Sequence, residues 1–136
     1  MQRLDSEPGS DGDSQTAIKH CVLIVDDDDE LLAVMVALVE SWGSTALPFN
    51  QFEAARTVLL EGVEAHALLV DVRIGGFNGL HLVHLARRLY PFMTVVAMTG
   101  FDDPVLRAEA EKAGAAYLLK PVPPEEIQRT LFRGLS

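Results

Sequence analysis

The feature that most restricts the fold of this 136-residue sequence is a regular alternation of short apolar runs with longer segments of helical periodicity. The first run, Cys21–Val25, precedes apolar residues at helical spacing over about 28–43, and the alternation then recurs. Apolar runs joined by amphipathic segments are typical of parallel strands in successive βα units. The sequence therefore predicts an α/β fold of five strand–helix repeats, whose later strands are expected at 44–47, 65–70, 93–98 and 115–119.

Capping residues mark the expected helix ends. Asp28 suits the N-cap of the first helix, and Asp103 followed by Pro104 suits the start of the fourth. Asn50 with Glu53 three residues later predicts a capping box for the second helix. Helix stops are expected at three glycines, Gly43, Gly62 and Gly114.

The first 18 residues differ in composition from the rest. They carry Ser, Asp, Gly, Glu and Pro and contain few apolar side chains. Such a segment buries too little apolar surface to offset the entropy of ordering. We expect a flexible acidic tail at 1–18 and one folded domain at 19–136.

Charge and composition exclude several classes of function. The formal net charge of −9 disfavours binding to nucleic acid or anionic lipid, so a protein partner is expected. The only cysteine, Cys21, excludes an intramolecular disulfide and suits a reducing compartment. No apolar stretch approaches the roughly 20 residues of a membrane span. We expect a cytoplasmic protein.

Polar residues end the predicted strands in a chemically selective pattern. Asp26 and Asp27 follow the first strand, Asp71 the third, Thr99 the fourth and Lys120 the fifth. Strand ends of a parallel sheet meet at one edge, where open α/β sheets bind ligands. Carboxylates within about 4 Å repel by roughly 4 kcal/mol per pair at an effective dielectric near 20. The pattern therefore favours a divalent cation such as Mg²⁺ together with a phosphate-bearing ligand.

At these strand ends the sequence resembles the receiver domains of two-component response regulators. The order and spacing of the motifs over about 19–136 make the resemblance specific. It implies a flavodoxin-like (βα)5 three-layer sandwich with strand order 2-1-3-4-5. The matching motifs are Val25-Asp26-Asp27-Asp28, Leu69-Val70-Asp71-Val72-Arg73, Met98-Thr99-Gly100 and Leu119-Lys120-Pro121.

The resemblance implies roles for the strand-end residues. Asp71 would accept a phosphoryl group from a phosphohistidine of a sensor histidine kinase or phosphotransfer protein. Mg²⁺, or Mn²⁺, would be held by Asp27 directly, by Asp26 through water, by Asp71 and by the backbone carbonyl of Arg73. Lys120 would pair with a phosphoryl oxygen. The expected role is that of a signalling phosphoacceptor, which assists its own phosphotransfer and slow autodephosphorylation, and not that of an enzyme.

The resemblance also implies a switch. Thr99 would turn its hydroxyl toward the phosphoryl group, and the ring of Tyr117 would move inward, although a fixed, half-buried ring is the alternative. The affected face would be that of the fourth helix, fifth strand and fifth helix, where phosphorylation could drive homodimer formation. The downstream target is not indicated. The Lys120–Pro121 peptide bond would be cis.

The sequence departs from the family after Asp71. Gly75 occupies the place of a common proline and is followed by Gly76, which predicts a flexible loop and affects the geometry of the Arg73 carbonyl. Asn78 replaces the commoner acid. Arg73 and Phe101 occupy positions that affect acyl phosphate hydrolysis in the family.

Alternatives remain at this stage. The main one is a pseudo-receiver that binds a protein without phosphorylation and shows no Mg²⁺ response in Trp42 fluorescence, if that ring senses the site. A third reading is an FMN-binding module of related architecture, but the Ser/Thr/Gly-rich phosphate loop of such a module is missing after the first strand, where acids would repel the flavin phosphate. His81 and His84 lie three apart on a helix but are expected to be exposed and not to bind metal. The chain is expected to be a stand-alone regulator, although a piece of a longer regulator or hybrid kinase would look the same.

Overall fold

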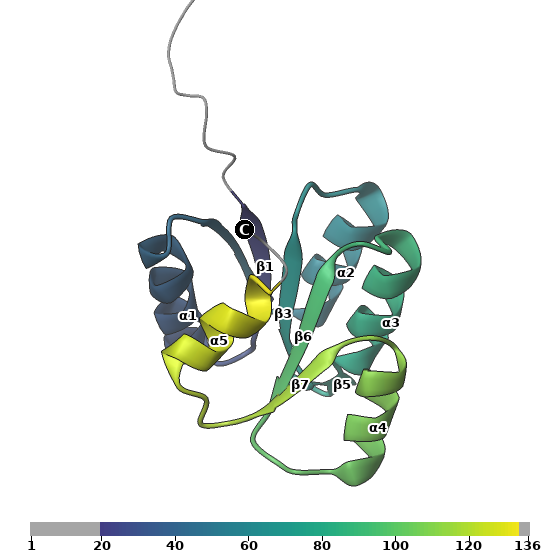
Figure 1. Ribbon diagram of the computed structural model, residues 1–136. Coiled ribbons are helices and arrows are strands. Elements are labelled where there is room, and N and C mark those ends of the chain that lie inside the picture. Colours follow the sequence, from purple (N-terminus) through teal and green to yellow (C-terminus); the bar gives the residue numbers. More distant parts are fainter. Residues whose placement is uncertain (1–19, 134–136) are drawn as a thin grey trace, which may run out of the picture.

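The computed structural model describes residues 20–133, and the tail expected at 1–18 lies outside the described residues. A parallel five-stranded sheet forms the centre of the fold (Figure 1). Its strands, in spatial order, are β2 (Thr45–Phe49), β1 (Cys21–Val25), β3 (Ala67–Asp71), β6 (Thr94–Thr99) and β7 (Ala116–Leu119). This is the order 2-1-3-4-5 of the flavodoxin-like fold, as the resemblance implies.

Helices cover both faces of the sheet and complete three layers (Figure 1). Alternate residues of β1 point to opposite layers: Leu23 packs with the α2 and α3 side, and Ile24 packs with the α1 and α5 side. Both side chains are almost fully buried, as expected of a central parallel strand. One layer contains α1 (Asp29–Ser41) and α5 (Pro124–Leu131), and the other contains α2 (Phe52–Glu61), α3 (Leu80–Leu89) and α4 (Pro104–Lys112).

The helix ends confirm most of the expected caps. Asp28 accepts hydrogen bonds from two amides of the first turn of α1, and Asp103 does the same for α4. The capping box predicted for the second helix is wrong. Gln51 is the N-cap of α2 without a side-chain cap bond, and Asn50 donates its amide to Asp29 Oδ1 at 3.0 Å. Asn50 thus links the loop after β2 to the start of α1.

The glycine-containing loop after β3 has more structure than its sequence predicts. Arg73–Ile74 (β4) and Phe77–Asn78 (β5) pair antiparallel in a short hairpin. Gly75 lies at its tip with φ of +60°, a conformation that L side chains rarely adopt. Asn78 accepts a hydrogen bond from the amide of Leu80 at the start of α3. The hairpin places the chain after Asp71 beside the acids that follow β1.

Candidate metal centre

Three carboxylates meet at the carboxyl edge of the sheet. Asp26 follows β1 and Asp71 ends β3, and these strands are neighbours with Val25 paired to Val70. One oxygen from each of Asp26, Asp27 and Asp71 lies within 4.8 Å of the others. Asp26 is buried, Asp71 is half-buried and Asp27 is exposed, so the cluster opens to solvent on the Asp27 side.

Backbone amides fix the two less exposed carboxylates. Asp26 Oδ1 accepts the amide of Asp28 at 2.9 Å, and Asp71 Oδ1 accepts the amide of Arg73 at 3.1 Å. Each bond spans two residues, as in an Asx turn. The second oxygen of each carboxylate faces Lys120, whose Nζ lies 3.4 Å from Asp26 Oδ2 and 3.3 Å from Asp71 Oδ2.

The β4–β5 hairpin fixes the third carboxylate. The amide of Gly75 donates to Asp27 Oδ2 at 2.7 Å, although the two residues are 48 apart in sequence. A proline at position 75 could not make this bond, because proline has no backbone N–H to donate. Asp27 is tied by this bond to the chain segment that follows Asp71.

Burial and charge oppose one another at Asp26. Burial raises the pKa of the Asp26 carboxyl above its ordinary value, and the nearby Asp71 charge adds to the rise. The Asp28 amide and Lys120 lower the same pKa without cancelling the effect of burial. A buried carboxylate with this balance gains from a further positive charge.

The donor set and spacing suit a hard divalent cation. Two oxygens on one ion can lie about twice the metal–oxygen bond apart, roughly 4 Å for Mg²⁺ and 5 Å for Ca²⁺. The three oxygens lie within 4.8 Å of one another. This spacing is compatible with one shared ion if a water molecule bridges one of the carboxylates to the metal. Among the residues that the structure describes, this is the one group of three or more potential metal ligands.

Thr99 and Tyr117 both contact Phe101 in the loop after β6. Thr99 is buried, and its Oγ1 accepts the amide of Phe101 at 3.2 Å. The hydroxyl of Tyr117 donates to the carbonyl of Phe101 at 3.4 Å, and the ring is 7 % exposed. The structure therefore links the two expected switch residues through one loop residue.

Two arginines flank these aromatic rings, and the sequence did not point to either contact. The guanidinium of Arg73 lies 4.4 Å from the centroid of Phe101, and that of Arg107 lies 4.8 Å from the centroid of Tyr117. Both distances suit a cation–π interaction. Arg107 also pairs with Asp102 at 3.0 Å. Sequence reasoning missed Arg107 because a helix-surface arginine carries no motif.

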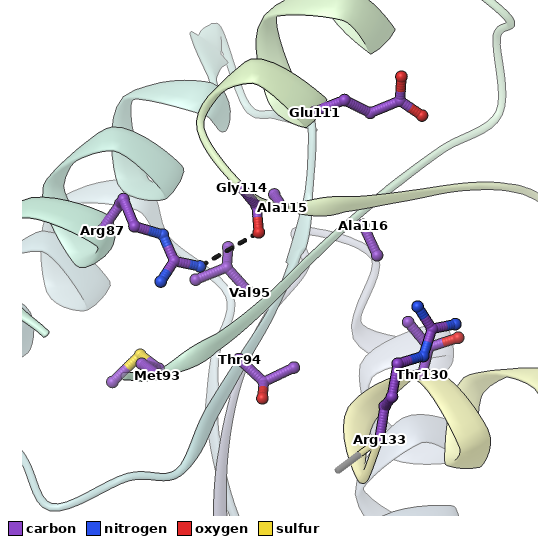
Figure 2. Close-up of a pocket in the computed structure, with 10 residues that line it drawn as sticks. All are labelled: Arg87, Met93, Thr94, Val95, Glu111, Gly114, Ala115, Ala116, Thr130 and Arg133. Carbon is purple, nitrogen blue, oxygen red and sulfur yellow. Dashed lines mark hydrogen bonds between the residues drawn. The ribbon is translucent and has the colours of Figure 1, made fainter. Parts of the chain in front are cut away.

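A hollow of about 460 Å³ lies at the amino ends of β6 and β7, away from the carboxyl edge that carries the acids. Figure 2 shows Arg87 at one side, bonded to the carbonyl of Gly114, and Arg133 at the other. None of the three acids lines it. Trp42 also lies away from the acids, packed edge-on against Phe132. Its fluorescence is therefore a poor direct sensor of the metal centre.

Comparison with known proteins agrees with this geometry. The model of the response regulator receiver domain matches residues 22–132. The chain belongs to this family. The Lys120–Pro121 peptide bond of this receiver domain is cis, as the resemblance implies. Membership supports a two-component signalling module over a flavin-binding one.

Relatives of this receiver domain include longer regulators. The transcriptional regulatory protein ZraR of Salmonella typhimurium is 32% identical over 117 residues, 85% of this chain and 26% of ZraR. FixJ of Azorhizobium caulinodans is 37% identical over 103 residues, 74% of this chain and 47% of FixJ. The chain thus spans about a quarter of ZraR and about half of FixJ.

Solved structures share the fold. A CheY-like receiver domain of Methanospirillum hungatei is 25% identical with a TM-score of 0.77, covering 82% of this chain and 90% of that chain. A response regulator of Burkholderia pseudomallei, solved with a phosphorylated aspartic acid and a calcium ion, is 24% identical with a TM-score of 0.75. That match covers 83% of this chain and 66% of the other. Within residues 20–133, no helix has the length and apolar character needed to cross a membrane.

Proposed function

We propose that this receiver domain accepts a phosphoryl group on Asp71 from a phosphohistidine of a sensor histidine kinase or phosphotransfer protein in the cytoplasm. The observation that supports the proposal is the convergence of Asp71, Asp26 and Lys120 from three separate strand ends, with Asp27 beside them. Acidic side chains scattered over a surface would not converge on one half-buried lysine. The proposal extends to the domain alone, with an unidentified downstream protein as its target and no direct contact with nucleic acid.

In the proposed transfer, the Asp71 carboxylate attacks phosphorus. A P–O bond to Asp71 forms as the P–N bond to the donor imidazole breaks, and the imidazole leaves with its electron pair and takes a proton from solvent. Lys120, 3.3 Å from Asp71 Oδ2, is placed to neutralise a phosphoryl oxygen. The Arg73 amide restrains the other Asp71 oxygen and limits rotation of the carboxylate.

The acids would hold Mg²⁺ or Mn²⁺. Asp27 and Asp71 would bind the ion directly, Asp26 through water, and the backbone carbonyl of Arg73 would add an oxygen. When bound, the cation offsets the charge on the acceptor and phosphoryl oxygens.

The switch is proposed to run through the loop after β6. Thr99 would release the Phe101 amide and turn its hydroxyl onto the phosphoryl group, which would draw the loop inward. Tyr117 is already buried and bonded to the Phe101 carbonyl, so its ring would respond to any movement of that loop. A shift in this two-state equilibrium would alter the face formed by α4, β7 and α5, with homodimer formation as one outcome. Slow hydrolysis of the acyl phosphate would reset the switch.

Intact-mass measurement tests the phosphoacceptor proposal. The full chain is incubated with acetyl phosphate or phosphoramidate, with Mg²⁺ or with EDTA. We expect a single added phosphoryl group that requires Mg²⁺ and is absent in Asp71→Asn. Asp28→Asn is the matched control, because Asp28 is a neighbouring acid that caps α1 and asparagine caps equally well.

Two results would contradict the proposal. One is no addition to the wild-type chain under conditions that phosphorylate another receiver domain. The other is equal addition to the Asp71→Asn variant. The first result would favour a pseudo-receiver, which binds a partner without phosphorylation.

A further inference from the structure

The surface of α3 is basic in a chain that is acidic overall. The sequence of Leu80–Leu89 contains two arginines and two histidines but no acid, while the whole chain has a formal charge of −9. His81, His84 and Arg88 are exposed and lie at positions i, i+3 and i+7, so they share one side of the helix. Neither the metal centre nor the proposed switch uses these residues.

A groove separates this side of α3 from α2. The two helices pack beside each other on the same face of the sheet (Figure 1). The groove encloses about 320 Å³, and Arg56 of α2 lines it opposite the α3 residues, with Phe52 beside them. No acidic side chain is among the lining residues. We call Arg56, His81, His84 and Arg88 the basic stripe.

Acids outside the groove neutralise only part of the basic stripe. Arg56 pairs with Glu53 at 3.8 Å, and His84 contacts Glu109 at 2.8 Å. Both pairs are about half exposed, so they contribute little to holding the side chains in place. Within residues 20–133, Arg88 and His81 form no salt bridge. Among the described residues, the guanidinium of Arg88 therefore has no acidic partner, and an anionic ligand in the groove would meet its charge.

The chain itself contains an acidic segment outside the described residues. Residues 5–13 include four acids, Asp5, Glu7, Asp11 and Asp13, and no basic residue. From the charge complementarity we propose that segment 5–13 docks in the groove between α2 and α3, against the basic stripe.

The chain between the segment and the fold is long enough to reach. His20 lies at the amino edge of the sheet, where its carbonyl accepts the amide of Thr45. The end of α3 lies at the same edge, because Tyr90 and Met93 connect it directly to the start of β6. Two strand spacings and one helix diameter separate these points, about 20 Å in all.

The reach of the segment exceeds that separation. Asp13 is seven residues from His20, which corresponds to about 23 Å of extended chain, and Asp5 can reach about 50 Å. Tethering at such lengths gives an effective concentration of order mM, so weak ionic contacts suffice for docking. The docked segment would cover the groove without covering the acids at the carboxyl edge.

Paramagnetic relaxation in the full chain tests the docking. A nitroxide is attached at Ser10→Cys in a Cys21→Ala background, so that it labels one position. We expect selective broadening of the α3 amides of His81, His84 and Arg88 at low salt. The broadening should fall about fivefold in Arg56→Glu/Arg88→Glu. It should also fall in about 0.5 M NaCl, where the Debye length is about 4 Å.

Two controls keep the test independent of the label and of folding. Arg129→Glu reverses an exposed charge on α5, on the other face of the sheet, and should leave the broadening unchanged. In the unlabelled chain, neutralising the four acids to Asn or Gln should shift the same α3 amides. Broadening that is uniform over the domain, or that persists in Arg56→Glu/Arg88→Glu, would overturn the proposal, as would unchanged α3 shifts on neutralisation.

Discussion

Replacing Gly79 with alanine tests how closely the start of α3 packs against the backbone of Asp71, and it changes no charged group. Gly79 is buried at the start of α3 in a helical conformation, with φ of −61° and ψ of −16°. Alanine adopts that conformation readily. An added Cβ would overlap the backbone carbonyl oxygen of Asp71 and approach Val72 Cα to 3.0 Å. The neighbouring atoms are backbone, so they cannot rotate away.

The expected magnitude follows from two opposing terms. Without the overlap, Gly→Ala at this conformation would stabilise the fold by about 0.4–1 kcal/mol through the unfolded state. Overpacking against fixed atoms costs about 1–3 kcal/mol. We therefore expect a net loss of about 1–2 kcal/mol in the free energy of unfolding, or a fall in Tm of roughly 3–8 °C for a domain of this size.

Urea unfolding followed by Trp42 fluorescence measures this loss. Gly76→Ala is the matched control, because an added Cβ there meets nothing within 4 Å and φ is not in the left-handed region. The Gly79 variant should also be phosphorylated more slowly, since the displaced carbonyl belongs to Asp71, the proposed phosphoacceptor. A Gly79→Ala chain as stable as the wild type would refute the close approach of α3 to the end of β3.

Three further substitutions test separate features. Burial raises the pKa of the Asp26 carboxyl above its ordinary value, so this group's contribution to stability is lost as the pH rises through that raised pKa. Asp26→Asn should therefore stabilise the metal-free chain at neutral pH by about 1 kcal/mol and weaken its response to Mg²⁺ in thermal unfolding. Burial lowers the pKa of His66 from 6.5, so on acidification the unfolded chain binds a proton at a higher pH than the folded chain does. Lowering the pH from about 7.5 to about 5.5 should therefore reduce the Tm of the wild type more than that of His66→Gln. Tyr90→Phe removes a 2.6 Å hydrogen bond to the Leu59 carbonyl and should cost about 1–2 kcal/mol in chemical denaturation, with no change in phosphorylation.

The sequence predicted the sheet and the meeting of its strand ends because both follow from local patterns. Continuous apolar runs identified the buried strands, and the observed starts differ from the expected ones by no more than two residues. The second strand extends through Pro48 to Phe49, beyond its expected end at residue 47. β2 is an edge strand, where proline need not donate to a neighbour. Single-residue propensity could not reveal that edge position.

Contacts between distant segments could not be read from the sequence. The bond from the Gly75 amide to Asp27 spans 48 residues, and the hairpin that positions Gly75 contains only two residues in each strand. Asn50 has the spacing of a capping box, but its amide instead bonds Asp29 across the loop. The cation–π contacts of Arg73 and Arg107 likewise depend on how loops and helices pack. In each case the contact depends on how distant segments pack together, which local sequence patterns do not specify.

The identity of the residue that carries the phosphoryl group is the most direct test of the account. Borohydride reduction of the phosphorylated full chain converts an aspartyl phosphate to homoserine, which peptide mass spectrometry then locates. Homoserine is expected at position 71 alone, and only when Mg²⁺ was present during phosphorylation. Homoserine at another acid, or a phosphoryl group found on a histidine or serine instead, would contradict it.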